Sequence, residues 1–138
     1  MSLIAHSQLP TYARLRDEGV DVLNVEEARP LVGRALHIGL LNMMPDKALA
    51  ATERQFMRLL GRTDIPIQVH LFTLPGLGRA ALGKVHVAAH YDSFEQIRST
   101  GLDALVVSGA NVQGTALANQ GFWQPLSEVL AWAADEVD

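Results

Sequence analysis

The chain has 138 residues, of which 49% are hydrophobic and 19% are charged, with a formal net charge of -4 and no cysteine. This length and composition fit one globular domain that buries about two thirds of the surface of its unfolded chain. The negative charge argues against a nucleic-acid partner, because phosphate binding requires a basic surface. The lack of cysteine excludes disulfides, thiolate metal sites and a cysteine nucleophile within these residues. No apolar run approaches the ~18 residues of a membrane span, and no secretory signal opens the chain, so a cytoplasmic location without a membrane partner is expected.

Residues 1–34 are expected to form an irregular N-terminal arm in front of an α/β domain at residues 35–138. Within the arm, residues 12–18 are compatible with a short helix. The segment "VDVLNV" at residues 20–25 alternates apolar and polar side chains, which indicates a short edge strand.

The stretch "ALHIGLLNMM" at residues 35–44 is almost continuously apolar, as in a strand buried on both faces of a parallel sheet. Pro45 ends this strand, and Asp46 is placed to cap a following helix. Gly61 is expected to end that helix. Its expected apolar face has helical spacing and consists of Leu49, Thr52, Phe56, Leu59 and Leu60.

A second strand is predicted at residues 65–74, where β-branched side chains alternate with polar ones. Residues 75–91 contain closely spaced glycines after a proline, which indicates a long, mobile connection. Ser93 is placed to cap a short helix that Gly101 ends, and a third, interior strand is expected at residues 103–109. A last helix is expected to bury Phe122, Leu126, Leu130, Ala133 and Val137.

The order of elements after the arm is strand, helix, strand, helix, strand, helix. Such alternation predicts an α/β fold: an open, mainly parallel sheet with helices on both faces and right-handed crossovers. In such sheets ligands bind outside the carboxyl ends of the strands. The loops expected at that edge are residues 42–47 and 108–114, and they face one crevice if their strands are neighbours.

Two groups in these loops suit the stabilisation of an oxyanion. Lys47 is one of two lysines in a chain with nine arginines, and its ammonium can stabilise developing negative charge. Gly109 allows close approach of a ligand to the backbone, whose N–H groups are donors. The alternative is that Lys47 is a solvated residue of the first helical turn and that Gly109 only permits a tight turn.

The histidines give weaker signals. His86 and His90 are four residues apart and would share a helical face, but no third ligand of obvious spacing accompanies them, so no metal site is expected. His37 and His70 fall within strand patterns and are interpreted as packing residues. Trp123 and Trp132 are expected to pack in the core or at an interface.

The segment "LLNMMPDKALAATERQFMRLLG" resembles the signature of the homoserine O-acyltransferases of the succinyltransferase type. The resemblance continues through "PIQVHLFTL", "HVAAHYDSFEQI", "GLDALVVSGA" and "FWQPLSEVLAWA", and it covers roughly residues 10 to 138. Within it, Thr52, Glu53 and Gln55 match one motif, and His86 and Tyr91 match another.

The resemblance implies a fold similar to the class I glutamine amidotransferases and a flavodoxin-like sheet. It also implies acyl transfer from acyl-CoA to the hydroxyl of homoserine in methionine biosynthesis, through a cysteine acyl-enzyme assisted by histidine and glutamate. Acyl-CoA is then a substrate, and no cofactor is required. The site residues implied are Lys47 as active-site support, the backbone of Gly109, Ala110 and Asn111 as part of an oxyanion hole, Asn42 at the substrate, and Gln113 at the position that selects the acyl group.

The chain departs from the family pattern in several places. Four residues, "ALAA", separate Lys47 from Thr52 where two are expected, and Asn111 replaces a proline. The acyl donor, acetyl or succinyl, and the acceptor therefore stay open. The nucleophilic strand is expected to follow residue 138, so the chain alone is expected to be inactive.

Two functional readings remain. In the first, the chain is the N-terminal part of the enzyme and forms a homo-oligomer or associates with the C-terminal half, because the third strand would present an unpaired edge. The alternative is a non-catalytic, flavodoxin-like module that binds a small metabolite or a protein partner. A fragment of a glutamine amidotransferase is less favoured.

Overall fold

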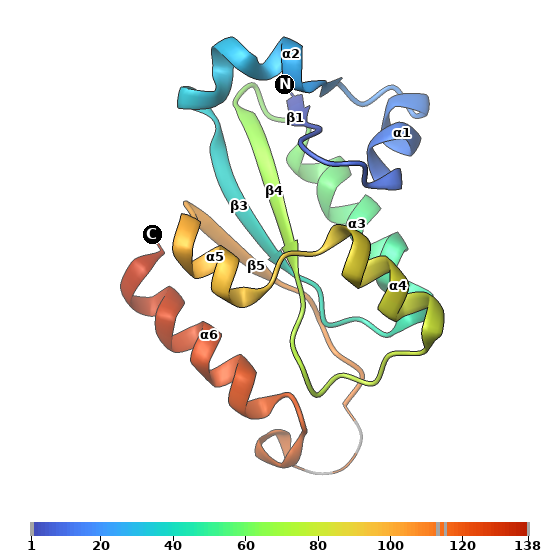
Figure 1. The fold of residues 1–138 in the computed structure, drawn as a ribbon, viewed down its shortest axis with the longest axis vertical. Helices are drawn as coiled ribbons and strands as arrows, with labels where there is room; N and C mark the ends of the chain where they lie inside the picture. The colour runs from blue at the N-terminus through green and yellow to red at the C-terminus, as the bar shows by residue number, and fades with distance from the viewer. Residues whose placement is uncertain (1, 113, 115, 138) are drawn as a thin grey trace.

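The computed structural model describes residues 2–112, 114 and 116–137, and they contain one parallel sheet of five strands (Figure 1). The strand order is β2-β1-β4-β3-β5. The bounds of the strands are β1 Ser2–Ile4, β2 Val22–Leu23, β3 Leu36–Leu41, β4 Pro66–Phe72 and β5 Ala104–Val107. The predicted open α/β fold with a parallel sheet is confirmed.

The two long strands at the centre carry the apolar runs that predicted them. β3 and β4 pair in register from Leu36 opposite Ile67 to Leu41 opposite Phe72, and Leu40, Leu41 and Phe72 have no exposed surface. Residues that are adjacent in a strand point to opposite faces, so both faces of these strands are apolar and need covering layers.

Helices cover both faces of the sheet. On one face, α1 (Pro10–Asp17) and α3 (Asp46–Leu60) pack through Tyr12, Leu15 and Met57 against the strands. On the other face, α5 (Phe94–Thr100) and α6 (Trp123–Glu136) enclose Leu41 and Phe72. Trp132 packs edge-on against Phe94, with ring centroids 5.6 Å apart, as its predicted packing role requires.

Residues 1–34, predicted to be irregular, contain regular structure. β1 lies inside the sheet, between β2 and β4, and β2 is the predicted short edge strand. α2 (Val25–Ala28) and a 3-10 helix (Arg29–Arg34) follow. β1 has only three residues, too few for a period to be recognised in the sequence, and its pairing with β4 is a long-range contact. The division of the chain into an arm and a domain remains a prediction.

The helical faces differ from the predicted ones by about one residue. α3 buries Leu49 and Thr52 as expected, but Leu59 is 63% exposed and Met57 is fully buried. α6 buries Val129, whereas Leu130 is 46% exposed. Apolar spacing alone does not determine which of these neighbouring side chains face the sheet.

The connection after β4 is not simply a loop, because it contains the ten-residue helix α4 (Ala81–His90). The predicted cap at Ser93 is confirmed: its side chain accepts the Gln96 N–H, and the Gln96 side chain accepts the Ser93 N–H. Gly101 ends α5 with a φ of 77°, and Gly61 ends α3, both as predicted.

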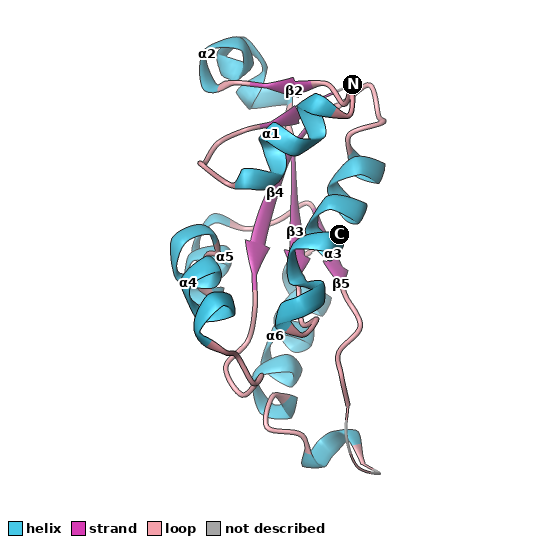
Figure 2. Cartoon of the chain, turned by 90° about the vertical axis from the view of Figure 1, so that its right-hand side faces the viewer, coloured by secondary structure: helices cyan, strands magenta, loops and turns pink. Residues whose placement is uncertain are grey.

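β5, predicted to be an interior strand, pairs with β3 and lies at the edge of the sheet among the strands described. Figure 2 shows that β3, β4 and β5 run in the same direction and that the loops after them extend from one end of the sheet, whereas α1, α2, β1 and β2 gather at the other. A second 3-10 helix, Leu117–Asn119, lies in the long connection from β5 to α6.

Candidate active site

The loops after β3 and β5 meet at the carboxyl edge of the sheet. β3 and β5 are hydrogen-bonded neighbours, with Leu41 opposite Val107. Beyond the ladder, the Ser108 N–H donates to the Leu41 carbonyl at 3.0 Å, and the Met43 N–H donates to the Ser108 hydroxyl at 2.7 Å. The strands are therefore neighbours, and residues 43–45 and Asn111 of the two loops line one cavity, but Lys47 does not line it.

Asp46, predicted above as the cap of α3, is instead the first residue of that helix, and Pro45 holds the capping position. Its carboxylate accepts the Ala80 N–H at 2.7 Å and a hydrogen bond from the Arg79 guanidinium at 3.1 Å. These bonds, the one from Ala80 above all, lower the pKa of Asp46. Asp46 thus joins the first turn of α3 to the two residues that precede α4. The sequence did not indicate this contact, because no helix was recognised within residues 75–91.

Arg79 clamps the turn after β3. Its guanidinium donates to the Met44 carbonyl at 2.6 Å, to the Asn42 carbonyl at 3.4 Å and to the Thr73 hydroxyl at 3.1 Å, in addition to Asp46. Its side chain is only 8% exposed. Five donors in a planar fork suit this task, and lysine could not replace it. Sequence reasoning missed Arg79, which stands alone between glycines and alanines.

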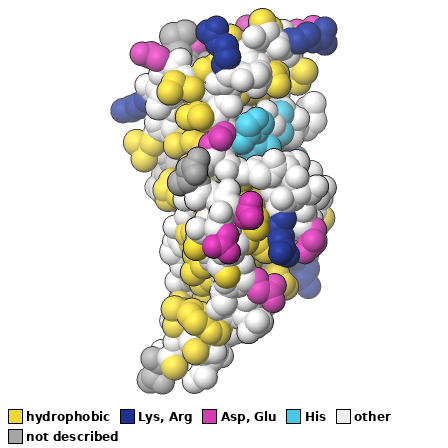
Figure 3. Space-filling model, turned by 90° about the vertical axis from the view of Figure 1, so that its left-hand side faces the viewer, with side chains coloured by type: hydrophobic (Ala, Val, Ile, Leu, Met, Phe, Trp, Pro, Cys, Tyr) yellow, Lys and Arg dark blue, Asp and Glu magenta, His cyan; other side chains and the backbone are white. Residues whose placement is uncertain are grey.

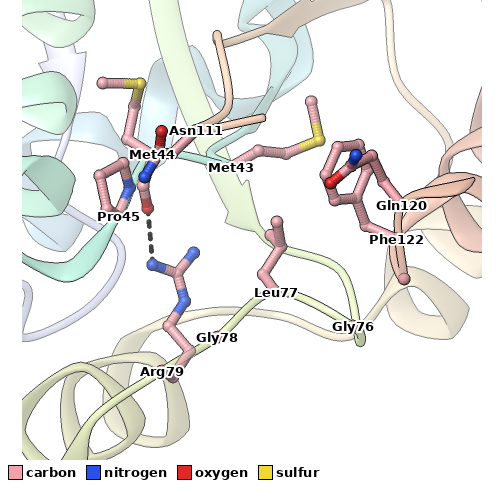
Figure 4. A pocket seen from close by; sticks show the side chains of 11 residues that line it. Met43, Met44, Pro45, Gly76, Leu77, Gly78, Arg79, Asn111, Gln120 and Phe122 are labelled. Atoms are coloured by element: carbon pink, nitrogen blue, oxygen red, sulfur yellow. Dashed lines mark hydrogen bonds between the residues drawn. The ribbon is translucent and has the colours of Figure 1, made fainter. Parts of the chain in front are cut away.

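A cavity of about 350 Å³ lies beside this clamp (Figure 4). Its walls come from three connections that are distant in the sequence: the turn after β3, the loop after β4, and the residues before α6. In Figure 4 the side chains of Met43 and Phe122 approach from opposite sides, and Leu77 lies below them. Asn111 and Arg79 contribute polar groups. Polar and apolar groups therefore contribute about equally to the walls of this cavity.

Lys47 lines a different cavity. It is exposed in the first turn of α3 and borders a hollow of about 550 Å³ between α3 and α4. The other walls are mainly apolar and include Leu49, Ala50 and Leu82, and His86 lies at one side. Lys47 and Asn111 therefore flank the turn after β3 rather than face each other within one cavity.

The backbone predicted to supply oxyanion donors follows β5. Gly109 is exposed, and a Cβ built on it would meet only the Met44 sulfur, at 3.9 Å. Gly109 therefore lies beside Met44, in the turn that leads to Lys47. A larger residue would also have room at position 109. The oxyanion role of Gly109, Ala110 and Asn111 remains a prediction. Gln113, the predicted acyl-specificity position, lies outside the described residues.

Asn42 is completely buried at the end of β3. Its side-chain N–H₂ group donates to the Leu49 carbonyl and the Tyr91 hydroxyl, both at 3.0 Å, and its side-chain oxygen accepts the Met44 N–H at 3.2 Å. These bonds shape the turn from within. The predicted role of Asn42 at the substrate remains a prediction.

The fully buried carboxylate of Glu53 lies behind Asn42. It accepts hydrogen bonds from Thr11 at 2.9 Å and Tyr91 at 2.5 Å, and it lies 2.6 Å from Nε2 of His86. Glu53 comes from one of the two motifs of the resemblance, and His86 and Tyr91 come from the other. His86 and His90 do lie close on α4, with ring centroids 5.1 Å apart, but His86 is engaged by Glu53.

A second histidine group lies away from the carboxyl edge, and Figure 3 shows histidine side chains gathered at the surface. His37 and His70, interpreted as packing residues, are stacked with centroids 5.1 Å apart and share a hydrogen bond of 2.8 Å between Nδ1 of His37 and Nε2 of His70. His6 lies 5.4 Å from the His70 ring. Burial, reinforced by the charges of His6 and His37, lowers the pKa of His70 to about 4.

Within residues 2–112, 114 and 116–137, no group of three or more histidine, aspartate or glutamate side chains is arranged to hold a metal ion. None of the helices in this part of the chain is long and apolar enough to cross a membrane.

Comparison with known proteins points to one family. The sequence profile of the homoserine O-succinyltransferases matches residues 2–138. The homoserine O-succinyltransferases of Methylobacter tundripaludum, Methylococcus capsulatus and Allochromatium vinosum are 53%, 54% and 55% identical to this chain. Each alignment covers 99% of this chain but 39% of the relative, so the chain spans about two fifths of the length of these relatives.

Proposed function

We propose that this chain, which belongs to the homoserine O-succinyltransferase family, is the N-terminal part of an enzyme that transfers an acyl group from acyl-CoA to the hydroxyl of homoserine. This step serves methionine biosynthesis in the cytoplasm. The observation that carries the proposal is the junction of the loops after β3 and β5, which brings the Lys47 turn against Gly109 at the carboxyl edge.

The chemistry requires a nucleophile that these residues do not contain, because the chain has no cysteine. A cysteine thiolate from the remainder of the enzyme attacks the thioester carbonyl, the bond from carbon to the CoA sulfur breaks, and CoA leaves as the thiol after protonation. The homoserine hydroxyl then gives up its proton to a base and attacks the acyl-enzyme, which releases the cysteine and O-acylhomoserine.

The part assigned to this chain is one wall of that site. Each attack forms a negatively charged tetrahedral intermediate. Hydrogen-bond donors that are already fixed in the correct position stabilise this intermediate. The donors proposed are the N–H groups of Gly109, Ala110 and Asn111, together with the Lys47 ammonium, whose flexible four-carbon stem lets it approach from the neighbouring hollow. Arg79 and Ser108 support this role, since their hydrogen bonds fix the turn between the two groups.

The second candidate function is a non-catalytic module that binds a small metabolite. The cavity beside Arg79 favours it, because about 350 Å³ with walls of Met43, Leu77 and Phe122 is sufficient for a small ligand. In this alternative, the turn that leads to Lys47 has no part in acyl transfer.

A chimera distinguishes the two functions. Residues 1–138 replace the matching segment of the Methylococcus capsulatus relative, to which they are 54% identical. Release of CoA thiol is then followed with succinyl-CoA or acetyl-CoA as donor and homoserine as acceptor. The proposal expects homoserine-dependent turnover with one of the donors. A chimera that is folded and inactive with both donors supports the binding module instead.

A further inference from the structure

Glu53 is a carboxylate without contact to solvent, and three side chains from two segments bind it. Thr11 of α1 donates to one carboxylate oxygen, and Tyr91 donates to the other, which also contacts His86 of α4. A carboxylate in the interior is tolerated only when its acceptor sites are used. The three contacts therefore make Glu53 the common anchor of α1, α3 and α4.

Tyr91 links Glu53 to Asn42 by hydrogen bonds. A tyrosine hydroxyl has one proton, and that of Tyr91 is used in the bond to Glu53. Its oxygen must then act as an acceptor, and it accepts from the Asn42 side chain. Burial and the negative charge of Glu53 raise the pKa of Tyr91, so the hydroxyl keeps its proton and its direction.

The orientation of the Asn42 amide follows from these bonds. Its N–H₂ group must face the two acceptors, which are the Tyr91 hydroxyl and the Leu49 carbonyl. Its oxygen is thereby directed to the Met44 N–H. The carboxylate in α3 thus fixes, through two side chains, the backbone of the turn that leads to Lys47.

We propose that Glu53 is a positioning residue of the acyl-transfer site and that it acts through Tyr91 and Asn42 on residues 43–47. This inference rests on the proposed function, because it assigns the turn a part in acyl transfer. Glu53 itself does not contact the substrate. Its effect is to restrict the positions that the Lys47 ammonium can reach.

Two substitutions test the proposal as a matched pair. Tyr91→Phe removes the two hydrogen bonds that link Glu53 to Asn42, whereas Thr11→Val removes one hydrogen bond to Glu53 that is not part of this link. Both substitutions keep most of the side-chain volume. Only Tyr91 lies on the path to Asn42. A general loss of stability would appear in both variants, whereas a positioning effect appears in Tyr91→Phe alone.

The first readout is hydrogen exchange of the Met44 amide in the 138-residue chain, measured relative to the amides of β3. We expect exchange to be on the order of tenfold faster in Tyr91→Phe and unchanged in Thr11→Val, as the loss of one constraint on a single hydrogen bond implies. Equal acceleration in both variants, or none in Tyr91→Phe, overturns the proposal.

The second readout is turnover of the chimera described above. Misplacement of a catalytic group by about 1 Å costs on the order of a hundredfold in rate, so kcat should fall by roughly tenfold to a hundredfold in Tyr91→Phe, with a smaller change in KM. Thr11→Val should keep its kcat. Equal kcat in the two variants contradicts a positioning role. If the unsubstituted chimera has no turnover, the proposed function fails, and Met44 exchange still decides whether Glu53 holds the turn.

Discussion

At the scale of single residues, the turn after β3 depends on two buried charges on opposite sides of it. Arg79 binds the Asn42 and Met44 carbonyl groups, and Glu53 acts through Tyr91 and Asn42 on the Met44 N–H. Neither was a predicted site residue, because a charged residue in a helix or connection is usually a solvated one. Lys47 and Gly109 were predicted from their place at strand ends, where local sequence is informative.

Replacement of Arg79 is expected to destabilise the fold strongly. Arg79→Met removes four hydrogen bonds and leaves the Asp46 carboxylate without its guanidinium partner, which should lower the free energy of unfolding by about 3 kcal/mol or more. Arg98→Met is the control, because Arg98 is about half exposed, pairs with the exposed Glu95 and otherwise lies over the Phe94 ring, contacts that contribute little at an exposed site. Urea unfolding of both variants measures the difference, and similar midpoints would contradict the clamp assigned to Arg79.

The histidine group of His6, His37 and His70 predicts acid sensitivity. Burial lowers the pKa of His70 from 6.5 to about 4, so the unfolded chain binds a proton at a higher pH than the folded chain does. Stability is therefore unaffected by His70 above pH 6.5 and falls as the pH drops from 6.5 towards 4, by about 2 kcal/mol at pH 5. In His70→Gln, the decline in unfolding free energy between pH 7.5 and 5 should be smaller by that amount, and an unchanged decline would contradict this assignment.

At the scale of elements, two glycines let two connections cross beside the candidate cavity. Gly76, in the loop after β4, has a φ of 87°, and a Cβ at that position would lie 2.3 Å from the Gly121 carbonyl oxygen. The clash is with backbone, which has little freedom to move. The walls of the cavity are therefore set by this crossing as well as by the side chains that line it.

Gly76→Ala should accordingly destabilise the protein by about 2 kcal/mol or more, since a positive φ and a backbone clash act together. Gly78→Ala offers a control two residues away, because a Cβ there meets nothing within 4 Å. Thermal unfolding of the two variants separates local crowding from the general cost of changing this loop. Equal melting temperatures for Gly76→Ala and the unsubstituted chain would show that the crossing is not tight.

The elements also show how far the sequence determines the fold. The apolar runs of β3 and β4 and the caps at Ser93 and Gly101 were predictable, because each has a local pattern with a physical cause. β1 and α4 were missed. β1 has three residues and depends on β4 for its pairing, and α4 has no side-chain cap and contains Gly83, so its local signals are weak.

At the scale of the whole molecule, β5 presents an edge to which no other described strand is paired. Its last residue, Val107, is 39% exposed, and an unpaired apolar edge favours association. The 138-residue chain is therefore expected to self-associate, and a charge at this edge should oppose it. Sedimentation should show a smaller species for Val107→Lys. Leu82→Lys, at an 86% exposed position on α4, is the control and should leave the association unchanged; equal effects of both would contradict the role of the β5 edge.

The contribution of this chain to acyl transfer can be measured as the rate at which succinyl-CoA acylates the chimera, followed by intact mass in the absence of homoserine. If this chain supplies one wall of the acyl-transfer site, Lys47→Ala should slow acylation on the order of a hundredfold to a thousandfold. Lys84→Ala, which removes the other lysine of the chain from an exposed position on α4, should leave the rate unchanged. Acylation at the same rate in all three proteins would contradict the claim and leave Lys47 a solvated residue of the first turn of α3.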